Sequence, residues 1–257
     1  MPDHSGKQEI SGQGHRDAAR TGLHDDLAWT AARQAAWLEA QELLRVMLLH
    51  AFPGRTAAVS SFGAESAVLL DLVASVDPGT PVLFLETGKH FTETLTYRDR
   101  LIETLGLRDV RSLQVPLHEL AREDAAGDLW QRDPDSCCDL RKTRPLQRAL
   151  ADFDAWITGR KRHHGAERSE LGLIERSNGQ VKINPLAHWS ADDIAAAMTA
   201  RNLPEHPLLA EGYLSIGCAP CTRRAICGAD PRSGRWAGLA KTECGIHKAP
   251  WAVTLGG

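Results

Sequence analysis

Short apolar segments alternate with longer amphipathic segments along most of the chain. Five segments have the length and composition of buried β-strands: TAAVS at 56–60, PVLFLET at 81–87, DVRSLQV at 109–115, DAWIT at 154–158 and VKINPL at 181–186. The first three are separated by AESAVLLDLVASV and FTETLTYRDRLIETLGL, which have helical spacing of apolar residues. This alternation predicts an α/β fold with a doubly wound, mostly parallel sheet.

The flanking regions differ from this pattern. The first part of the chain is polar, and we expect a mobile leader at residues 1–24. Residues 27–50 lack Pro and Gly and predict a long helix, and Ser190 predicts a capped helix start. Beyond Pro204 the periodicity is lost. We therefore expect an α/β domain over 25–236 and a flexible C-terminal tail over 237–257.

Composition and charge restrict the partners. The 257 residues are 42% hydrophobic and 25% charged, with a formal net charge of -3. This charge gives no general attraction to nucleic acid or to an anionic membrane. No segment reaches the roughly 20 apolar residues of a membrane span, and the N-terminus lacks the apolar core of a secretory signal. We expect a cytoplasmic protein that binds neither nucleic acid nor membrane.

Two predicted strands end in polar turns that suit an anion or a nucleotide. The segment Ser60–Ser66 leads from a strand through small residues into a helix, where free N–H groups and the positive helix end meet. The segment Leu85–Gly88 follows the next strand, and the carboxyl ends of parallel strands meet in one crevice. A tight βα turn and a plain strand exit are the alternatives. The candidate binding residues are Ser60, Ser61, Phe62, Gly63, Glu65, Glu86, Thr87 and Gly88.

Basic residues follow other strand ends. The run Arg160-Lys161-Arg162-His163-His164 follows the strand at 154–158, and Arg232 and Arg235 flank a glycine near the C-terminus. Arginine holds phosphate and sulfate oxygens through paired hydrogen bonds. A solvated surface is the alternative for each cluster taken singly.

Four of the six cysteines form two close pairs, Cys137-Cys138 and Cys218-Ala-Pro-Cys221. A reducing cytosol argues against structural disulfides. Zinc prefers CxxC pairs at both ends of its site, whereas a 4Fe-4S cluster offers a separate iron to each thiolate, so adjacent cysteines fit it better. We predict one 4Fe-4S cluster, with zinc, a redox dithiol or inert thiols as alternatives, and Lys142 beside it.

Two cysteines remain outside these pairs. Cys244 lies in Lys241–His247, where basic residues and His247 favour the nucleophilic thiolate and Glu243 opposes it. A single such cysteine can also be incidental. Cys227 has no partner at ligand spacing and is interpreted as a bystander.

In this order, a set of motifs resembles those of the sulfonucleotide reductases, specifically the assimilatory, thioredoxin-dependent adenylyl-sulfate reductases of bacteria. The motifs are SFGAES, FLETGKHFTET, CCDLRKTRPL, WITGRKR, INPLAHW, SIGCAPCTR, GRW and KTECGIH, and the resemblance covers roughly residues 55–247. It implies an adenine nucleotide α-hydrolase-like fold, with the SFGAES segment as a phosphate loop.

The resemblance also implies roles for individual residues. Cys244 is the expected nucleophile. Its thiolate attacks the sulfur of adenylyl sulfate, AMP leaves, and thioredoxin then releases sulfite from the S-sulfocysteine that remains. Cys137, Cys138, Cys218 and Cys221 are the expected cluster ligands. Lys142, Arg162, Arg232, Arg235 and His247 match positions around the phosphosulfate, and Lys161 is expected to share that task. The chain departs from the usual pattern at Glu86, Lys161 and the additional Cys227.

Three other functions are compatible with parts of this pattern. A reductase of the 3′-phosphorylated nucleotide would use the same Cys244 chemistry, although that preference usually accompanies loss of the cysteine pairs. An ATP-dependent adenylating or sulfur-transferring enzyme would share the fold. A non-catalytic iron–sulfur sensor would not need Cys244. The sequence leaves a homo-oligomer open.

Overall fold

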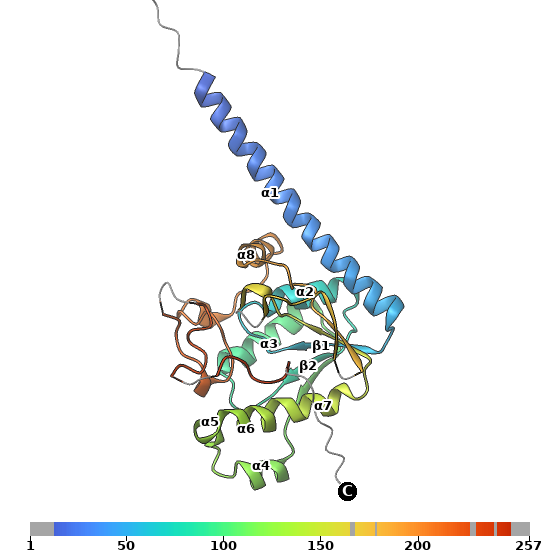
Figure 1. Ribbon diagram of the computed structural model, residues 1–257, viewed down its shortest axis with the longest axis vertical. Coiled ribbons are helices and arrows are strands. Elements are labelled where there is room, and N and C mark those ends of the chain that lie inside the picture. Colours follow the sequence, from blue (N-terminus) through green and yellow to red (C-terminus); the bar gives the residue numbers. More distant parts are fainter. Residues whose placement is uncertain (1–12, 165–167, 178, 227–229, 239–240, 248–257) are drawn as a thin grey trace, which may run out of the picture. The chain divides into compact units, whose positions relative to one another are not determined.

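The computed structural model describes residues 13–164, 168–177, 179–226, 230–238 and 241–247. The chain divides into two units, residues 1–39 and 40–257. Most of the first unit lies in helix α1 (Gln13–Val46), which Figure 1 shows as one long ribbon and which a π-helical turn, η1 (Met47–Ala51), follows. No described helix has the length and hydropathy of a membrane span.

Helix α1 starts earlier than the sequence predicts. We expected a helix from Leu27, but it begins at Gln13, so it overlaps the second half of the leader expected at residues 1–24. Residues 13–26 contain no proline, and the glycines at 14 and 22 cost only about 1 kcal/mol each in a helix. Residues 1–12 lie outside the described part of the chain.

The second unit contains a six-stranded sheet in the order β3-β2-β1-β4-β6-β5. Its strands are β1 (Thr56–Ser60), β2 (Val82–Leu85), β3 (Val110–Leu113), β4 (Ala155–Thr158), β5 (Ile174–Ser177) and β6 (Gln180–Ile183). All neighbouring pairs are parallel except β5 with β6. The predicted doubly wound, mostly parallel sheet is confirmed, and the strand order reverses between β1 and β4.

Helices cover both faces of this sheet. Figure 1 shows α2 (Ser66–Val76), α3 (Thr92–Leu105) and α8 (Ala191–Ala200) on one side of it. On the other side lie α4 (Leu117–Glu123), α5 (Leu129–Arg132), α6 (Pro134–Cys138) and α7 (Arg144–Leu150). Strands β1, β2 and β4 are consequently buried along their whole length, as central parallel strands require.

One local prediction is confirmed, and one strand was not predicted. Ser190 caps α8 in a complete capping box with Asp193, as its sequence indicates. Strand β5 was not predicted, because its sequence IERS has no apolar run and Ile174 is half exposed. It is an antiparallel edge strand. It pairs with β6 because the turn between them places the two segments side by side, and its own composition does not indicate a strand.

Beyond α8 the described chain forms loops and short 3-10 turns, η5 (Pro207–Leu209) and η6 (Ala219–Cys221), as the loss of periodicity predicts. His206 fixes the first of these loops to α3. Its Nδ1 accepts a hydrogen bond from the N–H of Leu208 at 3.2 Å, and its Nε2 lies 3.0 Å from Oγ1 of Thr94. The ring therefore carries its proton on Nε2, and burial lowers the pKa of His206 to about 4.

This buried imidazole predicts a pH dependence of folding. Because the folded pKa lies below the unfolded value near 6.5, the unfolded chain binds the proton first, and stability falls as the pH drops from 6.5 towards 4. At pH 5 the free energy of unfolding should be lower by about 2 kcal/mol at most from this residue. His206→Asn keeps an acceptor for Leu208 and should remove that part of the pH dependence.

The measurement is denaturant unfolding of the full chain at pH 7.5 and pH 5. His188→Asn, which changes an exposed histidine, is the control and should behave as wild type. Equal pH dependence in wild type and His206→Asn would contradict the assignment.

Candidate active site

A cavity of about 240 Å³ opens at the carboxyl ends of β1 and β4, where the strand order reverses. Ligands of open α/β sheets bind at this position. The walls come from regions that are distant in sequence. These are the turn after β1, the end of β2 with His90, Lys142, the segment after β4, the loop at 214–218, residues 231–236 and the C-terminal segment. Cations, a cysteine of the CxxC pair and Cys244 all line this one cavity.

The turn after β1 is shaped by its own side chains. Oγ of Ser60 accepts a hydrogen bond from the N–H of Phe62 at 3.1 Å, and Phe62 has a left-handed backbone with φ 48°. The Phe62 ring is fully buried edge-on against Phe84, so it supports the turn and does not line the cavity. A Cβ at Gly63 would lie 3.2 Å from the carbonyl oxygen of Ile216. The turn thus presents Ser60, Ser61, Gly63 and Glu65 to the cavity.

The exit of β2 borders the same cavity through Leu85 and His90. Glu86, Thr87 and Gly88 were expected to contact a base or ribose in the same crevice, but they are not among the residues that line the cavity. Thr87 instead places Oγ1 3.4 Å from Sγ of Cys218, and its carbonyl accepts a hydrogen bond from Arg141 at 2.7 Å. This strand exit therefore supports the cysteine region.

The two cysteine pairs come together beside the cavity. Cys137 and Cys138 end α6, whose N-cap Asp133 accepts hydrogen bonds from the N–H groups of Asp135 and Ser136. Cys218 and Cys221 flank the turn η6, which an isolated bridge between His90 and Cys218 ties to the chain after β2. Cys137, Cys138 and Cys218 are buried, and no described cysteine forms a disulfide.

Electrostatics show how close these thiols are. Burial and then the charge of Cys138 raise the pKa of Cys137 to about 12, with Cys218 and Cys221 adding to the shift. Burial raises the pKa of Cys138 to about 11. Burial acts on Cys218 in the same sense, but Lys142 and Thr87 outweigh it and lower its pKa. Burial and mutual repulsion thus disfavour the thiolate form of Cys137 and Cys138, and a bound cationic metal cluster would remove this repulsion.

No three His, Cys, Asp or Glu side chains within the described residues are grouped around one point as ligands of a single metal ion. A 4Fe-4S cluster does not require such convergence, because each thiolate binds its own iron. The donor set of Cys137, Cys138, Cys218 and Cys221 fits that cluster better than it fits a mononuclear zinc site.

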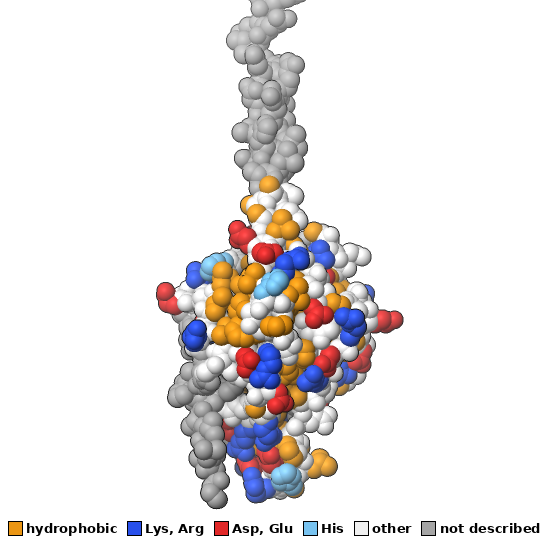
Figure 2. Space-filling model, turned by 90° about the vertical axis from the view of Figure 1, so that its right-hand side faces the viewer, with side chains coloured by type: hydrophobic (Ala, Val, Ile, Leu, Met, Phe, Trp, Pro, Cys, Tyr) orange, Lys and Arg blue, Asp and Glu red, His pale blue; other side chains and the backbone are white. Residues whose placement is uncertain are grey.

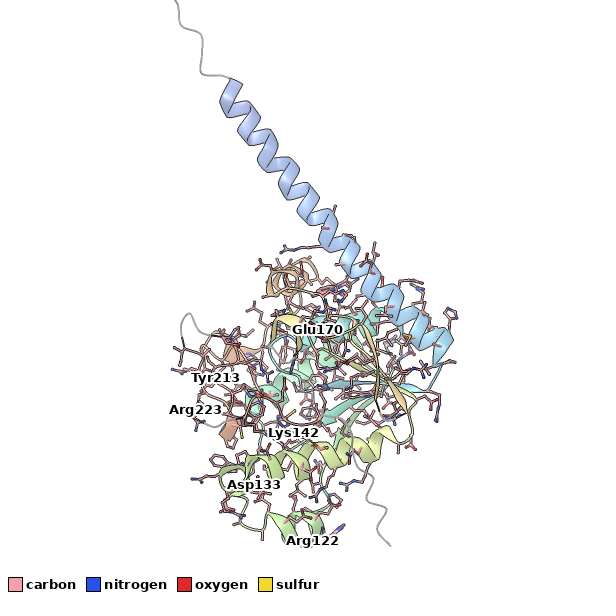
Figure 3. The ribbon with its side chains drawn as sticks, in the orientation of Figure 1. Arg122, Asp133, Lys142, Glu170, Tyr213 and Arg223 are labelled. Carbon is pink, nitrogen blue, oxygen red and sulfur yellow. The ribbon has the colours of Figure 1, made fainter. Side chains whose placement is uncertain are left out.

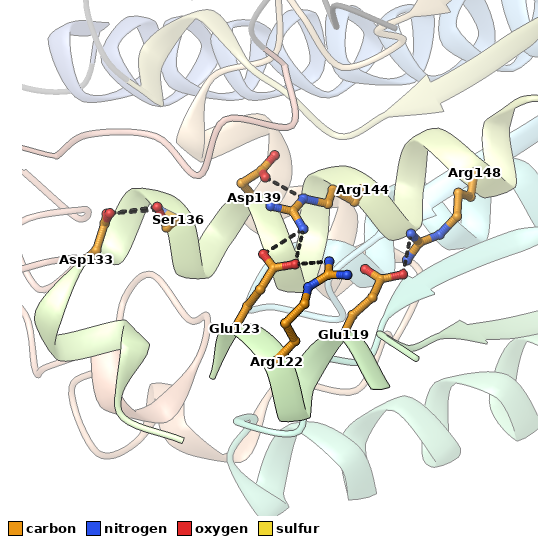
Figure 4. Close-up of polar contacts among 8 residues, drawn as sticks. All are labelled: Glu119, Arg122, Glu123, Asp133, Ser136, Asp139, Arg144 and Arg148. Atoms are coloured by element: carbon orange, nitrogen blue, oxygen red, sulfur yellow. Dashed lines mark hydrogen bonds and ion pairs between the residues drawn. The ribbon is translucent and has the colours of Figure 1, made fainter. Parts of the chain in front are cut away.

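A network of ion pairs joins the helical segment that follows the tandem cysteines to α4 (Figure 4). Arg144 bridges Asp139 at 2.7 Å and Glu123 at 2.8 Å, and Arg148 reaches Glu119 at 2.9 Å. Between α6 and α7 the backbone widens into a π-helical turn, η2 (Asp139–Thr143). That turn carries Lys142, which Figure 3 shows between the C-terminal loops and these helices.

Six cations line the cavity: Lys142, Arg160, Lys161, Arg168, Arg232 and Arg235. Sequence reasoning selected Lys142, Lys161, Arg232 and Arg235, and the structure brings all four together. It named Arg160 only as part of the basic run at 160–164, without selecting it as a binding residue, and it missed Arg168. Arg162 was expected here but is not a lining residue, because its Nε donates to the carbonyl of Leu171 at 2.8 Å.

This density of charge is a local property. On the face drawn in Figure 2, Lys and Arg side chains are interspersed with Asp and Glu. Several cations of the cavity also have carboxylate partners, but the buried Nε atoms of Arg160 and Arg235 have no hydrogen-bond partner within the described residues. Such unpaired donors favour binding of an anionic ligand.

Close approach fixes Arg235. Its guanidinium lies 4.4 Å from the ring centroid of Trp236, a cation–π contact. A Cβ at Gly217 would overlap the guanidinium, so a larger residue there would require the Arg235 side chain to move away. The GRW and SIGC segments are therefore packed closely together, although Gly217 and Gly234 lie 17 positions apart in the chain.

The C-terminal segment Lys241–His247 is docked in the cavity. Ile246 is buried in a core cluster that includes Val59, Leu85 and Trp156, and Cys244 packs against that cluster. The ring of His247 stacks on Trp156 with a centroid distance of 5.5 Å and an angle of 4°. Burial, then the charges of Arg160 and Lys182, lower the pKa of His247 well below its usual value, so its ring is neutral.

Comparisons with known proteins agree with this arrangement. The phosphoadenosine phosphosulfate reductase domain family matches residues 55–224. A Mesorhizobium japonicum protein named adenosine 5′-phosphosulfate reductase is 50% identical over 85% of this chain and 86% of its own length. A Chelativorans protein of the same name is 53% identical over 76% and 79%. A Gloeobacter violaceus protein named phosphoadenosine 5′-phosphosulfate reductase is 42% identical over 81% and 88%.

A solved structure is also similar. The phosphoadenylyl-sulfate reductase of Candida auris, crystallised with phosphate, is 27% identical and aligns over 85% of this chain and 100% of its own, with a TM-score of 0.61. The fold is thus the adenine nucleotide α-hydrolase-like fold that the sequence predicts.

Docking of the C-terminal segment predicts how accessible Cys244 is. Substitution of a buried isoleucine by alanine typically lowers stability by about 2–5 kcal/mol. Ile246→Ala should therefore weaken docking of the segment and raise the rate of Cys244 alkylation at least several-fold. The readout is peptide-level mass spectrometry of the anaerobic protein treated with iodoacetamide. Ile226→Ala, which changes a side chain that is 69% exposed, is the control. An unchanged alkylation rate in Ile246→Ala would show that Ile246 does not hold the segment.

Proposed function

The chain belongs to the phosphoadenosine phosphosulfate reductase family, and we propose that it reduces adenylyl sulfate to sulfite and AMP with thioredoxin as the electron donor. This reaction serves sulfate assimilation and cysteine biosynthesis. A cytoplasmic location follows from the need for reduced thioredoxin. Two relatives named for adenosine 5′-phosphosulfate are at least 50% identical to this chain, which favours that nucleotide over its 3′-phosphorylated form.

One observation carries the proposal: Cys244 lines the same cavity as the turn after β1 and six cations. The turn and the cations suit a phosphate and a sulfate that are joined to each other. A thiol in the same space can reach the sulfur of that group. Neither an adenylating enzyme nor a sensor requires a cysteine at this point.

In the first step, the Cys244 thiolate attacks the sulfur of adenylyl sulfate. The bond between that sulfur and the bridging oxygen breaks, AMP leaves with the bonding electrons, and an S-sulfocysteine remains. Lys142, Arg232 and Arg235 stabilise the negative charge that develops on the leaving phosphate. Ser60, Ser61 and Gly63 hold the phosphate through the turn after β1.

In the second step, a thioredoxin thiolate attacks Sγ of Cys244 and sulfite leaves with the electrons of the S–S bond. The second thioredoxin cysteine resolves the mixed disulfide, so thioredoxin is oxidised and Cys244 returns to the thiol. A docked Cys244 is hard for a protein to reach. We therefore assign residues 237–257 as a tail that swings out for this step, on the domain of residues 25–236.

The same proposal includes one 4Fe-4S cluster held by Cys137, Cys138, Cys218 and Cys221. When bound, the cluster supplies fixed charge and cross-links α6 to the turn η6. Lys142 stands between this charge and the cavity, since Cys218 and Cys244 both raise its pKa against the effect of burial. Cys227, outside the described residues, has no assigned role.

The covalent step gives a direct test of the nucleophile. Anaerobically purified protein mixed with adenylyl sulfate, without thioredoxin, should gain roughly 80 Da, the mass of one SO₃ group on the attacking thiol. Intact-protein mass spectrometry should show the gain in wild type, its absence in Cys244→Ser and its loss on adding reduced thioredoxin. The phosphorylated nucleotide run in parallel should react more slowly. No adduct on wild type with its cluster intact would rule out the covalent scheme.

The cluster is tested by composition. Wild type should contain about four iron atoms and four sulfide ions per chain, the content of one cubane cluster. Its absorption spectrum should show the broad band in the blue region that thiolate-bound iron–sulfur clusters give. Cys138→Ser should lose most of the iron, whereas Cys227→Ser should retain it. Equal iron in the two variants, or stoichiometric zinc in wild type, would refute the ligand assignment.

A further inference from the structure

Glu243, the residue before Cys244, contacts two arginines of the cavity, Arg168 and Arg232. Its carboxylate accepts a hydrogen bond from Nε of Arg168 at 2.8 Å and also contacts Nη2 of that arginine. Its second oxygen lies 3.4 Å from Nη2 of Arg232. The side chain of Glu243 is 18% exposed, and those of Arg168 and Arg232 are 10% and 20% exposed.

Two other cations of the cavity have carboxylate partners of a different kind. Lys161 pairs with Glu65 at 2.7 Å, and Arg160 pairs with Glu175. Glu65 lies in the turn after β1 and Glu175 lies in β5, so these partners are parts of the sheet domain. The carboxylate on Arg168 and Arg232 comes instead from the docked C-terminal segment.

The arginine pair needs an anion. Burial, together with the positive charges of Arg168 and Arg235, disfavours the charged form of Arg232, and Glu243 opposes this. Carboxylates and sulfate or phosphate oxygens bind guanidinium groups with the same paired geometry. Two anions on one arginine pair repel each other, so an oxyanion ligand has to displace Glu243.

We propose that Glu243 is an intramolecular competitor that occupies the oxyanion position of the empty cavity and is displaced when the sulfate or phosphate group of the substrate binds. The proposal rests on the proposed function for the identity of that substrate. It makes Glu243 a positioning and specificity residue.

Displacement of Glu243 does not require release of Cys244. Nη2 of Arg232 donates to the carbonyl of Thr242 at 2.6 Å on one side, and Ile246 and His247 are buried on the other. The carboxylate can rotate away between these two attachments. A nucleotide also gains contacts at the turn after β1, whereas a free sulfate has the arginine pair as its main attachment. The tethered carboxylate therefore discriminates against free oxyanions.

The test is calorimetric titration of sodium sulfate into the full-length, anaerobically purified protein, at an ionic strength held constant with chloride. Glu243→Gln should bind sulfate roughly tenfold more tightly than wild type, the gain expected if the open state is about a tenth of the empty protein. Glu243→Asp keeps the charge and should stay within about threefold of wild type. Glu170→Gln, an exposed residue of the neighbouring loop labelled in Figure 3, should bind as wild type does.

Equal or weaker sulfate binding by Glu243→Gln would overturn the proposal. A second measurement needs no variant: saturating sulfate should speed amide hydrogen exchange at residues 241–245 of wild type, and unchanged exchange in the presence of bound sulfate would also overturn it. The proposed function and the role of Glu243 can fail independently. If Glu243→Gln binds sulfate more tightly but wild type forms no S-sulfocysteine with adenylyl sulfate, Glu243 is a competitor and the protein is not this reductase. If wild type forms S-sulfocysteine but Glu243→Gln does not bind sulfate more tightly, the protein is the reductase and Glu243 is not a competitor.

Discussion

Positive charge gathered in a partly buried crevice is the constraint on which this structure depends. Six cations line one cavity, and desolvated charges of one sign are unstable without counter-charges. The domain supplies Glu65 and Glu175 from fixed positions, and the C-terminal segment supplies Glu243. An anionic ligand is the remaining source of negative charge. Because the ligand and Glu243 compensate the same cations, charge balance links ligand binding to the segment that carries Cys244.

The sheet makes this crowding possible. Strands β1 and β4 lie side by side where the order reverses, so their exits face one opening. The chain after β2 borders the same cavity through Leu85 and His90, and its Thr87 also contacts Cys218. Arg141 joins that exit to the buried Asp124 at the end of α4, which couples the cysteine region to the helical layer. Removing one partner of such a buried pair typically costs about 3–5 kcal/mol.

Cys244 has to reach the cavity in the first step and a second protein in the next, and docking of the C-terminal segment accounts for the first of these. Ile246 and His247 pack into the core over Trp156, which brings the thiol to the cavity wall. The attachment is short, and the neutral His247 ring adds no further positive charge to the cavity. Because these contacts lie within one short segment, they can be broken together when the segment is released.

The sequence by itself determined the central strands, the capped helix at Ser190 and the residue types of the site. These are local signals, because buried parallel strands are continuous apolar runs and a capping box lies within four residues. Tertiary structure decided what local signals do not carry. Strand β5 forms because β6 is beside it, Arg162 turns to Leu171 while Arg160 enters the cavity, and Arg168 and Glu243 meet across 75 positions of the chain. Charge pairing between distant residues depends on which chain segments the fold brings together, and no spacing in the sequence encodes it.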